Sequence, residues 1–99
     1  MLRVTYKSNH LSRVCTDYSE AKREYGERMA YLIHQRIDQL KAADSVEMLV
    51  QFSIGRCHAL SGNRKGEYAM DLVHPFRLVF QNKSGSISVI RVINIEDYH

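Results

Sequence analysis

The stretch CHALSGNRKGEYAMDLVHPFRLVF, residues 57–80, decides the fold. Three short strands are predicted in and just after this stretch. The runs Cys57 to Leu60 and Glu67 to Leu72 alternate apolar and polar residues, which is typical of strands with one buried face, and Phe76 to Gln81 is the next strand. A polar, glycine-containing loop over residues 61–66 separates the first two runs, and Pro75 separates the last two. Because these connections are short, the strands are expected to pair antiparallel.

Further elements are expected on both sides of this stretch. Strands are predicted from Leu2 to Tyr6 and from Ile87 to Ile95. Between them, apolar residues recur at steps of three and four, which predicts one long amphipathic helix from about Tyr18 to Lys41, capped by Asp17. The run Asp44-Ser45-Val46-Glu47 predicts a second, short helix that ends near Gln51. The sequence therefore predicts a single α+β domain over residues 1–99, a twisted antiparallel sheet with two or so helices packed on one face.

The composition is that of an ordinary globular domain, with 44% hydrophobic and 25% charged residues among 99. No apolar stretch approaches the roughly 20 residues that span a membrane, and the first residues lack the apolar run of a signal peptide. We therefore expect a cytoplasmic protein without membrane contact. In that reducing compartment Cys15 and Cys57 are expected to be plain buried thiols.

Positive charge gathers in the second half of the chain. Residues 52–91 carry six Lys or Arg against two Asp or Glu, whereas residues 1–51 carry eight against seven. Most of the excess is arginine, whose planar fork suits phosphate, so nucleic acid is a reasonable partner. Charge alone favours the plainer interpretation, a mildly basic solvated surface.

Two local features of the basic half could bind an anion. His58 stands on a predicted strand just before a loop that holds Arg64 and Lys65 between glycines, and such a loop can bring N–H groups and cations close to a phosphate. Arg77 lies inside a strand otherwise built for burial. Either its stem covers apolar surface while its head reaches water, or it is a rigid donor fork held ready for an anion.

The C-terminus places titratable groups together at the end of the last predicted strand. It reads Glu96-Asp97-Tyr98-His99. A histidine next to a carboxylate is suited to proton transfer near neutral pH. A frayed, solvated tail is the plainer interpretation of the same residues.

Taken together, these runs resemble the HigB branch of the RelE/ParE toxin superfamily. The pattern is a His-x-Leu-x-Gly-[Asp/Asn]-Arg-x-Gly loop over residues 58–66, an Arg-[Leu/Ile]-x-Phe strand over residues 77–80, and a closing Asp97-Tyr98-His99. The three signals occur in the family's order and spacing over residues 56–99. The resemblance implies a RelE-like microbial RNase fold and a ribosome-dependent messenger RNA endonuclease, encoded beside a HigA-like helix-turn-helix antitoxin. It implies no cofactor, and contact with DNA only through the antitoxin complex.

The resemblance also implies roles for single residues. By position, His58 and His99 would be the acid–base histidines, Asp97 and Tyr98 would support them, and Arg77 would contact phosphate. Arg64 matches the family's loop arginine, and the predicted RNA-binding set is completed by residues of the basic half: Arg56, Lys65 and Arg91. The chain departs from the pattern at Ser61, where some members carry an active-site lysine, and Lys65 is the candidate substitute.

The chemistry is coherent without a metal, because RNA carries its own nucleophile, the 2′-hydroxyl. One histidine can take its proton, another can protonate the leaving 5′-oxygen, and an arginine can neutralise charge on the phosphorane. A metal site lacks the usual ligand spacings among its candidate residues, Cys57, His58, His74 and His99. A Cys57–His58 catalytic pair is disfavoured because neighbours on a strand point to opposite faces.

Two other functions stay open at this point. One is a ParE-like toxin that binds DNA gyrase and has no nuclease activity. The other is an RNA-binding module without catalysis. The terminal Asp97-Tyr98-His99 favours the nuclease, since a gyrase poison has no need of an acid–base pair there.

Overall fold

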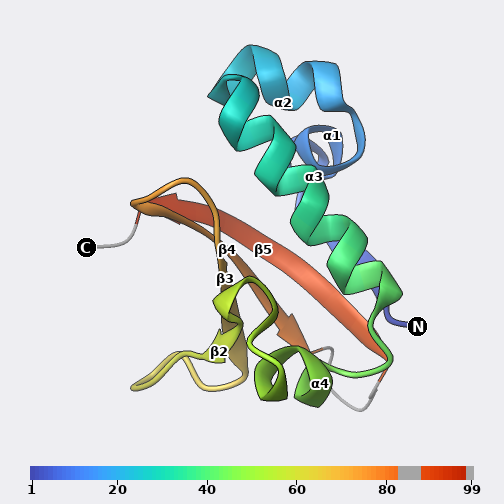
Figure 1. Ribbon diagram of the computed structural model, residues 1–99, viewed down its shortest axis with the longest axis vertical. Coiled ribbons are helices and arrows are strands. Elements are labelled where there is room, and N and C mark those ends of the chain that lie inside the picture. Colours follow the sequence, from blue (N-terminus) through green and yellow to red (C-terminus); the bar gives the residue numbers. More distant parts are fainter. Residues whose placement is uncertain (83–87, 98–99) are drawn as a thin grey trace.

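A computed structural model describes residues 1–82 and 88–97 of the chain. Its five strands form one sheet in the order β1-β5-β4-β3-β2, and four helices and a short 3-10 helix, η1, complete the fold (Figure 1). The elements are β1 (Arg3–Tyr6), α1 (Asn9–Thr16), α2 (Tyr18–Tyr25), α3 (Glu27–Ala42), α4 (Val46–Gln51), η1 (Ile54–Arg56), β2 (His58–Ala59), β3 (Glu67–Asp71), β4 (Phe76–Asn82) and β5 (Val89–Asp97). The predicted α+β class is confirmed.

The sheet is mixed, which corrects the prediction of a wholly antiparallel sheet. Strands β2 to β5 pair antiparallel in chain order, as their short connections predict. Strand β1 instead runs parallel to β5, from the pair Arg3–Val89 to the pair Tyr6–Val92. The argument from short connections does not apply to β1, because four α-helices and η1 follow it before the chain returns to the sheet.

The predicted single helix from Tyr18 to Lys41 is wrong, because the chain breaks at Gly26. There φ is +88° and ψ is 168°, a conformation open essentially to glycine, and it ends α2 and begins α3. The cap predicted at Asp17 is confirmed, since its carboxylate accepts hydrogen bonds from the backbone N–H groups of Ser19 and Glu20. A further helix, α1, was not predicted; Ser8 caps it by accepting from Leu11 N–H at 3.1 Å.

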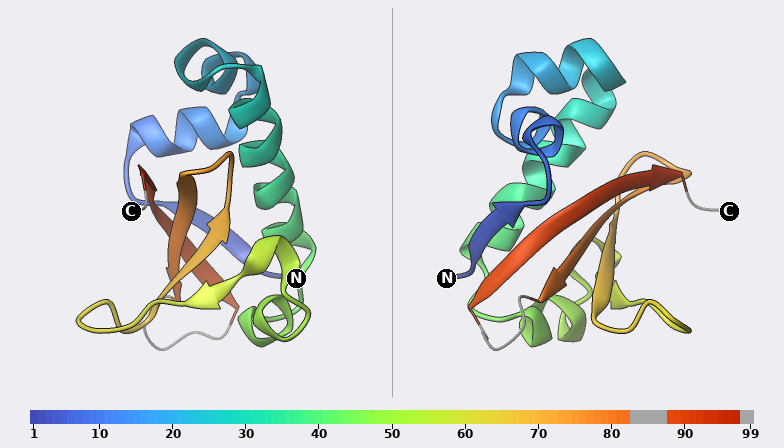
Figure 2. Two further views of the ribbon diagram at one scale, coloured as in Figure 1. Left: turned by 60° about the vertical axis from the view of Figure 1, so that its left-hand side comes forward. Right: turned by 180° about the vertical axis from the view of Figure 1, so that it is seen from behind.

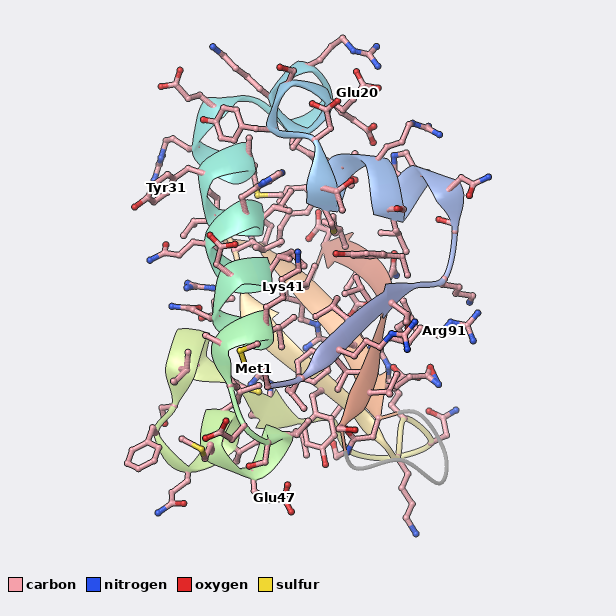
Figure 3. The ribbon with its side chains drawn as sticks, turned by 90° about the vertical axis from the view of Figure 1, so that its right-hand side faces the viewer. Met1, Glu20, Tyr31, Lys41, Glu47 and Arg91 are labelled. Carbon is pink, nitrogen blue, oxygen red and sulfur yellow. The ribbon has the colours of Figure 1, made fainter. Side chains whose placement is uncertain are left out.

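The helices cover one face of the sheet, as predicted (Figure 2). Their buried side chains form one core with those from a single face of β3, β4 and β5, including Ile33, Leu40, Met70, Phe80 and Val92. On the outer side of α3, Tyr31 points away from this core (Figure 3). Within the described ranges, no helix is both long enough and apolar enough to cross a membrane. The opposite face of the sheet, called the open face below, carries polar side chains.

Candidate active site

Strand register aligns the polar side chains of the open face in rows. Residues paired across a sheet point to the same side, and one such row is Asp71 on β3, Arg77 on β4 and Glu96 on β5. In the next row along the strands, His58 on β2 pairs with Ala69. The fold therefore brings His58 and Arg77, predicted from separate motifs, onto one face.

Glu96 joins two arginines at the centre of this face. Its carboxylate accepts from Arg64 through Nη1 and Nη2, at 2.9 and 3.0 Å, and from Arg77 through Nε at 2.8 Å and Nη2 at 2.6 Å. Arg64 also donates from Nε to Glu67 at 2.8 Å. The contact with Arg64 spans 32 positions of sequence and fastens the 61–66 loop to the sheet.

The sequence pattern contains Glu96 only as part of the terminal motif and predicts no role for it. The signal was available in principle, because an arginine in a buried strand requires a partner and Glu96 pairs with Arg77 in register. Finding it needed the register between β4 and β5, which a bulge at Val79 and Phe80 shifts by one residue.

The charges of this cluster perturb one another. Hydrogen bonds from Arg64 and then Arg77 lower the pKa of Glu96 to about 2, against an opposing effect of burial. The bond to Glu96 in turn raises the pKa of Arg64 further above its ordinary value. Glu96 is therefore ionised at every physiological pH, and both guanidinium groups are held in place by a permanent charge.

Two hollows on the open side meet at His58 and Arg77, which line both. The first has a volume of about 250 Å³ and is also lined by Arg56, Asp71 and His74 among others. The second, of about 320 Å³, lies against the loop that carries Ser61 and Arg64. Two histidines and three arginines thus line two hollows that share His58 and Arg77.

The hydrogen bond of the His58 ring defines its protonation pattern. Nδ1 lies 2.8 Å from the backbone carbonyl oxygen of Arg56. A carbonyl can only accept, so Nδ1 carries the hydrogen, and in the neutral ring Nε2 holds the lone pair. The His58 side chain is exposed, so Nε2 is the nitrogen suited to exchange a proton with a substrate.

The remaining cations predicted to bind RNA surround this centre at different distances. Arg56 lines the first hollow and pairs with Asp71, its Nε 3.3 Å from the carboxylate. Lys65 is exposed on the loop next to Arg64. Arg91 pairs in register with Gln81, four residues along β4 from Arg77, which corresponds to about 13 Å. Figure 3 shows Arg91 beside β1, at the far side of the sheet from β2.

The structure does not bring Asp97 to the Arg77–Glu96 pair. Asp97 pairs in register with Phe76, and alternation along the strand puts it on the face opposite Glu96. Tyr98 and His99, the other predicted terminal site residues, lie outside the described residues. The roles predicted for all three stay predictions.

The two cysteines carry unreactive thiols. Both are buried and free, and burial raises the pKa of Cys57 to about 11 and that of Cys15 to about 12. Within residues 1–82 and 88–97, no three His, Cys, Asp or Glu side chains gather as metal ligands would. His99, one of the four metal ligands weighed above, falls outside that range.

Comparison with known proteins gives a clear result for the fold only. No protein-family model and no curated protein sequence matches the chain. Among solved structures, it is similar to a YoeB/ParE toxin from Agrobacterium tumefaciens, with a TM-score of 0.66 and 20% identity over 99% of this chain and 100% of that one. It is also similar to a chain of the YoeB–YefM complex from Staphylococcus aureus, with a TM-score of 0.63 and 21% identity over 100% and 98%. It is similar as well to the YoeB dimer from Staphylococcus aureus, with a TM-score of 0.63 and 20% identity over 99% of this chain and 97% of that one.

These likenesses extend over essentially the whole length of both partners, so no large insertion or missing layer separates them. None of these three proteins is named HigB, the branch suggested by the sequence pattern. The chain has the fold of the YoeB/ParE-type toxins.

Proposed function

We propose that this chain is the toxin of a type II toxin–antitoxin pair and that it acts as a metal-independent endoribonuclease on messenger RNA at the ribosome. The observation that carries this proposal is that His58 and Arg77 line two hollows on the open face and that Arg64 lines the second of them. The fold shared with YoeB/ParE-type toxins supports the toxin role. The loop, strand and terminal motifs support the HigB branch in particular.

The proposed reaction transfers the phosphoryl group within the RNA. The 2′-oxygen forms a bond to phosphorus while the bond from phosphorus to the 5′-oxygen breaks. Nε2 of His58 accepts the 2′-hydroxyl proton, and His99 donates a proton to the leaving oxygen. Arg77 and Arg64 stabilise the charge that develops on the phosphorane. The products are a 2′,3′-cyclic phosphate and a 5′-hydroxyl end.

The net charge of the arginine–glutamate cluster favours an RNA substrate that the ribosome holds at the site. Arg64 and Arg77 are opposed by Glu96 and Glu67, so this cluster is formally neutral, and a phosphate must share the guanidinium donors with Glu96. Free RNA should therefore bind weakly. An RNA held in place by the ribosome reaches the site at a high effective concentration, which suits a ribosome-dependent nuclease.

A cognate antitoxin is the proposed partner. Structural neighbours include a YoeB–YefM toxin–antitoxin complex, which supports a bound antitoxin, and the HigB-like motifs favour a HigA-like helix-turn-helix protein. Purification of the chain from its native operon should yield a stable complex with the product of an adjacent gene. Recovery of the chain alone would contradict this part of the proposal.

One experiment separates the candidate functions. The purified protein is added to defined messenger RNA on translating ribosomes, to the same RNA without ribosomes, and to a gyrase supercoiling assay. The nuclease proposal predicts RNA fragments with ribosomes, little cleavage without them and unaffected gyrase. Inhibited gyrase with intact RNA would support the ParE-like function, and RNA binding with neither effect would support a non-catalytic module.

A further inference from the structure

The segment that leads into β2 has an unusual backbone. Between α4 and His58, Ser53, Gly55 and Arg56 have φ values of +51°, +59° and +56°. This left-handed region is disfavoured for residues with a side chain, so Ser53 and Arg56 are strained there. Strain of this kind persists only where surrounding contacts impose it, and it concentrates at functional sites.

Arg36 on α3 packs against this segment at Gly55. Its Nε donates to the backbone carbonyl of Asp71 at 2.7 Å, and its Nη1 donates to the Gln39 side chain at 3.1 Å. The guanidinium lies directly against Gly55, where a Cβ would stand 2.8 Å from Nε and 2.9 Å from Cδ of Arg36. Only a glycine lets the segment approach so closely.

Asp71 on β3 also contacts the end of the segment that leads into β2. The Asp71 carboxylate lies 3.3 Å from Nε of Arg56, while its backbone carbonyl accepts from Arg36. Asp71 thus contacts both Arg36 and the Arg56 side chain. The backbone carbonyl of Arg56 accepts from Nδ1 of His58 at 2.8 Å.

We propose that Arg36 is a positioning residue which, through Gly55 and Arg56, locks His58 in the tautomer that carries its hydrogen on Nδ1. The lock leaves Nε2 as the nitrogen that exchanges a proton with the substrate. Without such a bond an exposed imidazole populates both tautomers, and one of them has no lone pair on Nε2. The catalytic consequence rests on the proposed nuclease function, but the tautomer itself does not.

The tautomer can be measured directly. Protein labelled with ¹⁵N-histidine is studied at alkaline pH by two-bond ¹H–¹⁵N correlation, and His58 is assigned from the signal that its Gln variant loses. We expect the wild-type ring to carry its hydrogen on Nδ1. Gly55→Ala and Arg36→Ala should give a mixture of tautomers, and Arg36→Lys, which keeps a donor for the Asp71 carbonyl, should restore part of the preference.

A matched control isolates the contact from backbone strain. Gly62 also has a positive φ, +72°, but nothing lies within 4 Å of its added Cβ. Gly62→Ala therefore introduces the backbone strain of a left-handed conformation without a steric clash of the added Cβ. We expect His58 in this variant to keep the wild-type tautomer.

Kinetics on ribosome-bound RNA give the second readout. Gly55→Ala and Arg36→Ala should lower kcat roughly 10²-fold, as misplacement of a catalytic group does, with little change in KM because Arg64 and Arg77 are untouched. Arg28→Ala, which removes an exposed arginine from the same helix, should leave both constants unchanged.

Specific results would overturn the inference. They are a wild-type His58 with its hydrogen on Nε2, or folded Gly55→Ala and Arg36→Ala proteins that keep both the tautomer and the wild-type kcat. If Gly55→Ala does not fold, the wild-type spectrum and Arg36→Ala decide. If the variants lose the tautomer but wild-type protein cleaves no RNA, the proposed function fails and the positioning role stands.

Discussion

Replacement of Glu96 by Gln tests the central ion cluster most sharply. The substitution keeps the shape of the side chain and removes the charge that joins Arg64 to Arg77. Arg77 is only 8% exposed, so its guanidinium would lose the charge of Glu96 where water can replace it poorly. We expect Glu96→Gln to be destabilised, and the loss to depend on pH.

The size of the effect follows from the pKa of Glu96. It falls from 4.5 to about 2 on folding, and at 1.36 kcal/mol per unit this sets a ceiling of about 3 kcal/mol. The side chain is 18% exposed, so screening by solvent lowers the expected loss to about 2 kcal/mol at pH 7. Because the folded-state pKa is the lower one, this stabilisation is complete above about pH 4.5 and disappears as the pH falls to about 2.

Urea denaturation of wild type and variant at pH 7, 4 and 3 measures the difference in unfolding free energy. The difference in unfolding free energy between wild type and Glu96→Gln should be about 2 kcal/mol at pH 7 and should decrease steadily below pH 4.5. Glu20→Gln is the control, because Glu20 also accepts from an arginine, Arg23, at 2.8 Å, but on an exposed surface of α2. Glu20→Gln should change the free energy of unfolding little. Equal stability of Glu96→Gln and wild type at pH 7, or a gap that does not vary with pH, would refute the reasoning.

Three further outcomes are expected. Arg77→Ala should slow single-turnover RNA cleavage 10²–10³-fold through lost charge stabilisation, while Arg28→Ala cleaves at the wild-type rate; equal rates would remove Arg77 from the site. Deletion of His99 should lower cleavage 10²–10⁴-fold without shifting the Tm, and a folded, fully active deletion would exclude His99 as an acid–base residue. Cys15 and Cys57 should react with a thiol reagent only slowly at pH 7 in native protein and rapidly in urea, because burial raises their pKa values to about 12 and 11; rapid native labelling would contradict the buried positions.

Elements with a local signal could be predicted from the sequence. The runs after residue 56 predicted β2, β3 and β4 to within one or two residues, because glycine-containing loops and Pro75 mark where these strands begin and end. The cap at Asp17 was also predictable, since its carboxylate binds backbone only two and three residues away.

Features that depend on distant parts of the chain could not be predicted. The parallel pairing of β1 with β5 joins residues that are more than 80 positions apart, and no local pattern encodes it. The break at Gly26 leaves the apolar period intact, so the stripe continues across it.

The candidate site also contains residues that a local pattern predicts and residues whose role depends on distant parts of the chain. His58, Arg64 and Arg77 stand out locally, as a histidine and an arginine beside a glycine loop and an arginine in an apolar strand. The role of Glu96 appears only when the register places it opposite Arg77, and the role of Arg36 appears only when α3 packs behind Gly55. Partners supplied by tertiary contacts have no signature in a single sequence.

The chemistry of the cut ends tests the central claim most directly. Messenger RNA on purified ribosomes is incubated with wild-type protein or with His58→Gln, and the ends of the RNA fragments are analysed. Metal dependence is tested in a parallel reaction, in which added divalent ions are chelated after the ribosomes are assembled. The account predicts 5′-hydroxyl and 2′,3′-cyclic phosphate ends, cleavage that does not require a free divalent ion, and a loss of 10²–10⁴-fold in rate for His58→Gln. Ends that carry a 5′-phosphate, or wild-type cleavage by His58→Gln, would contradict it.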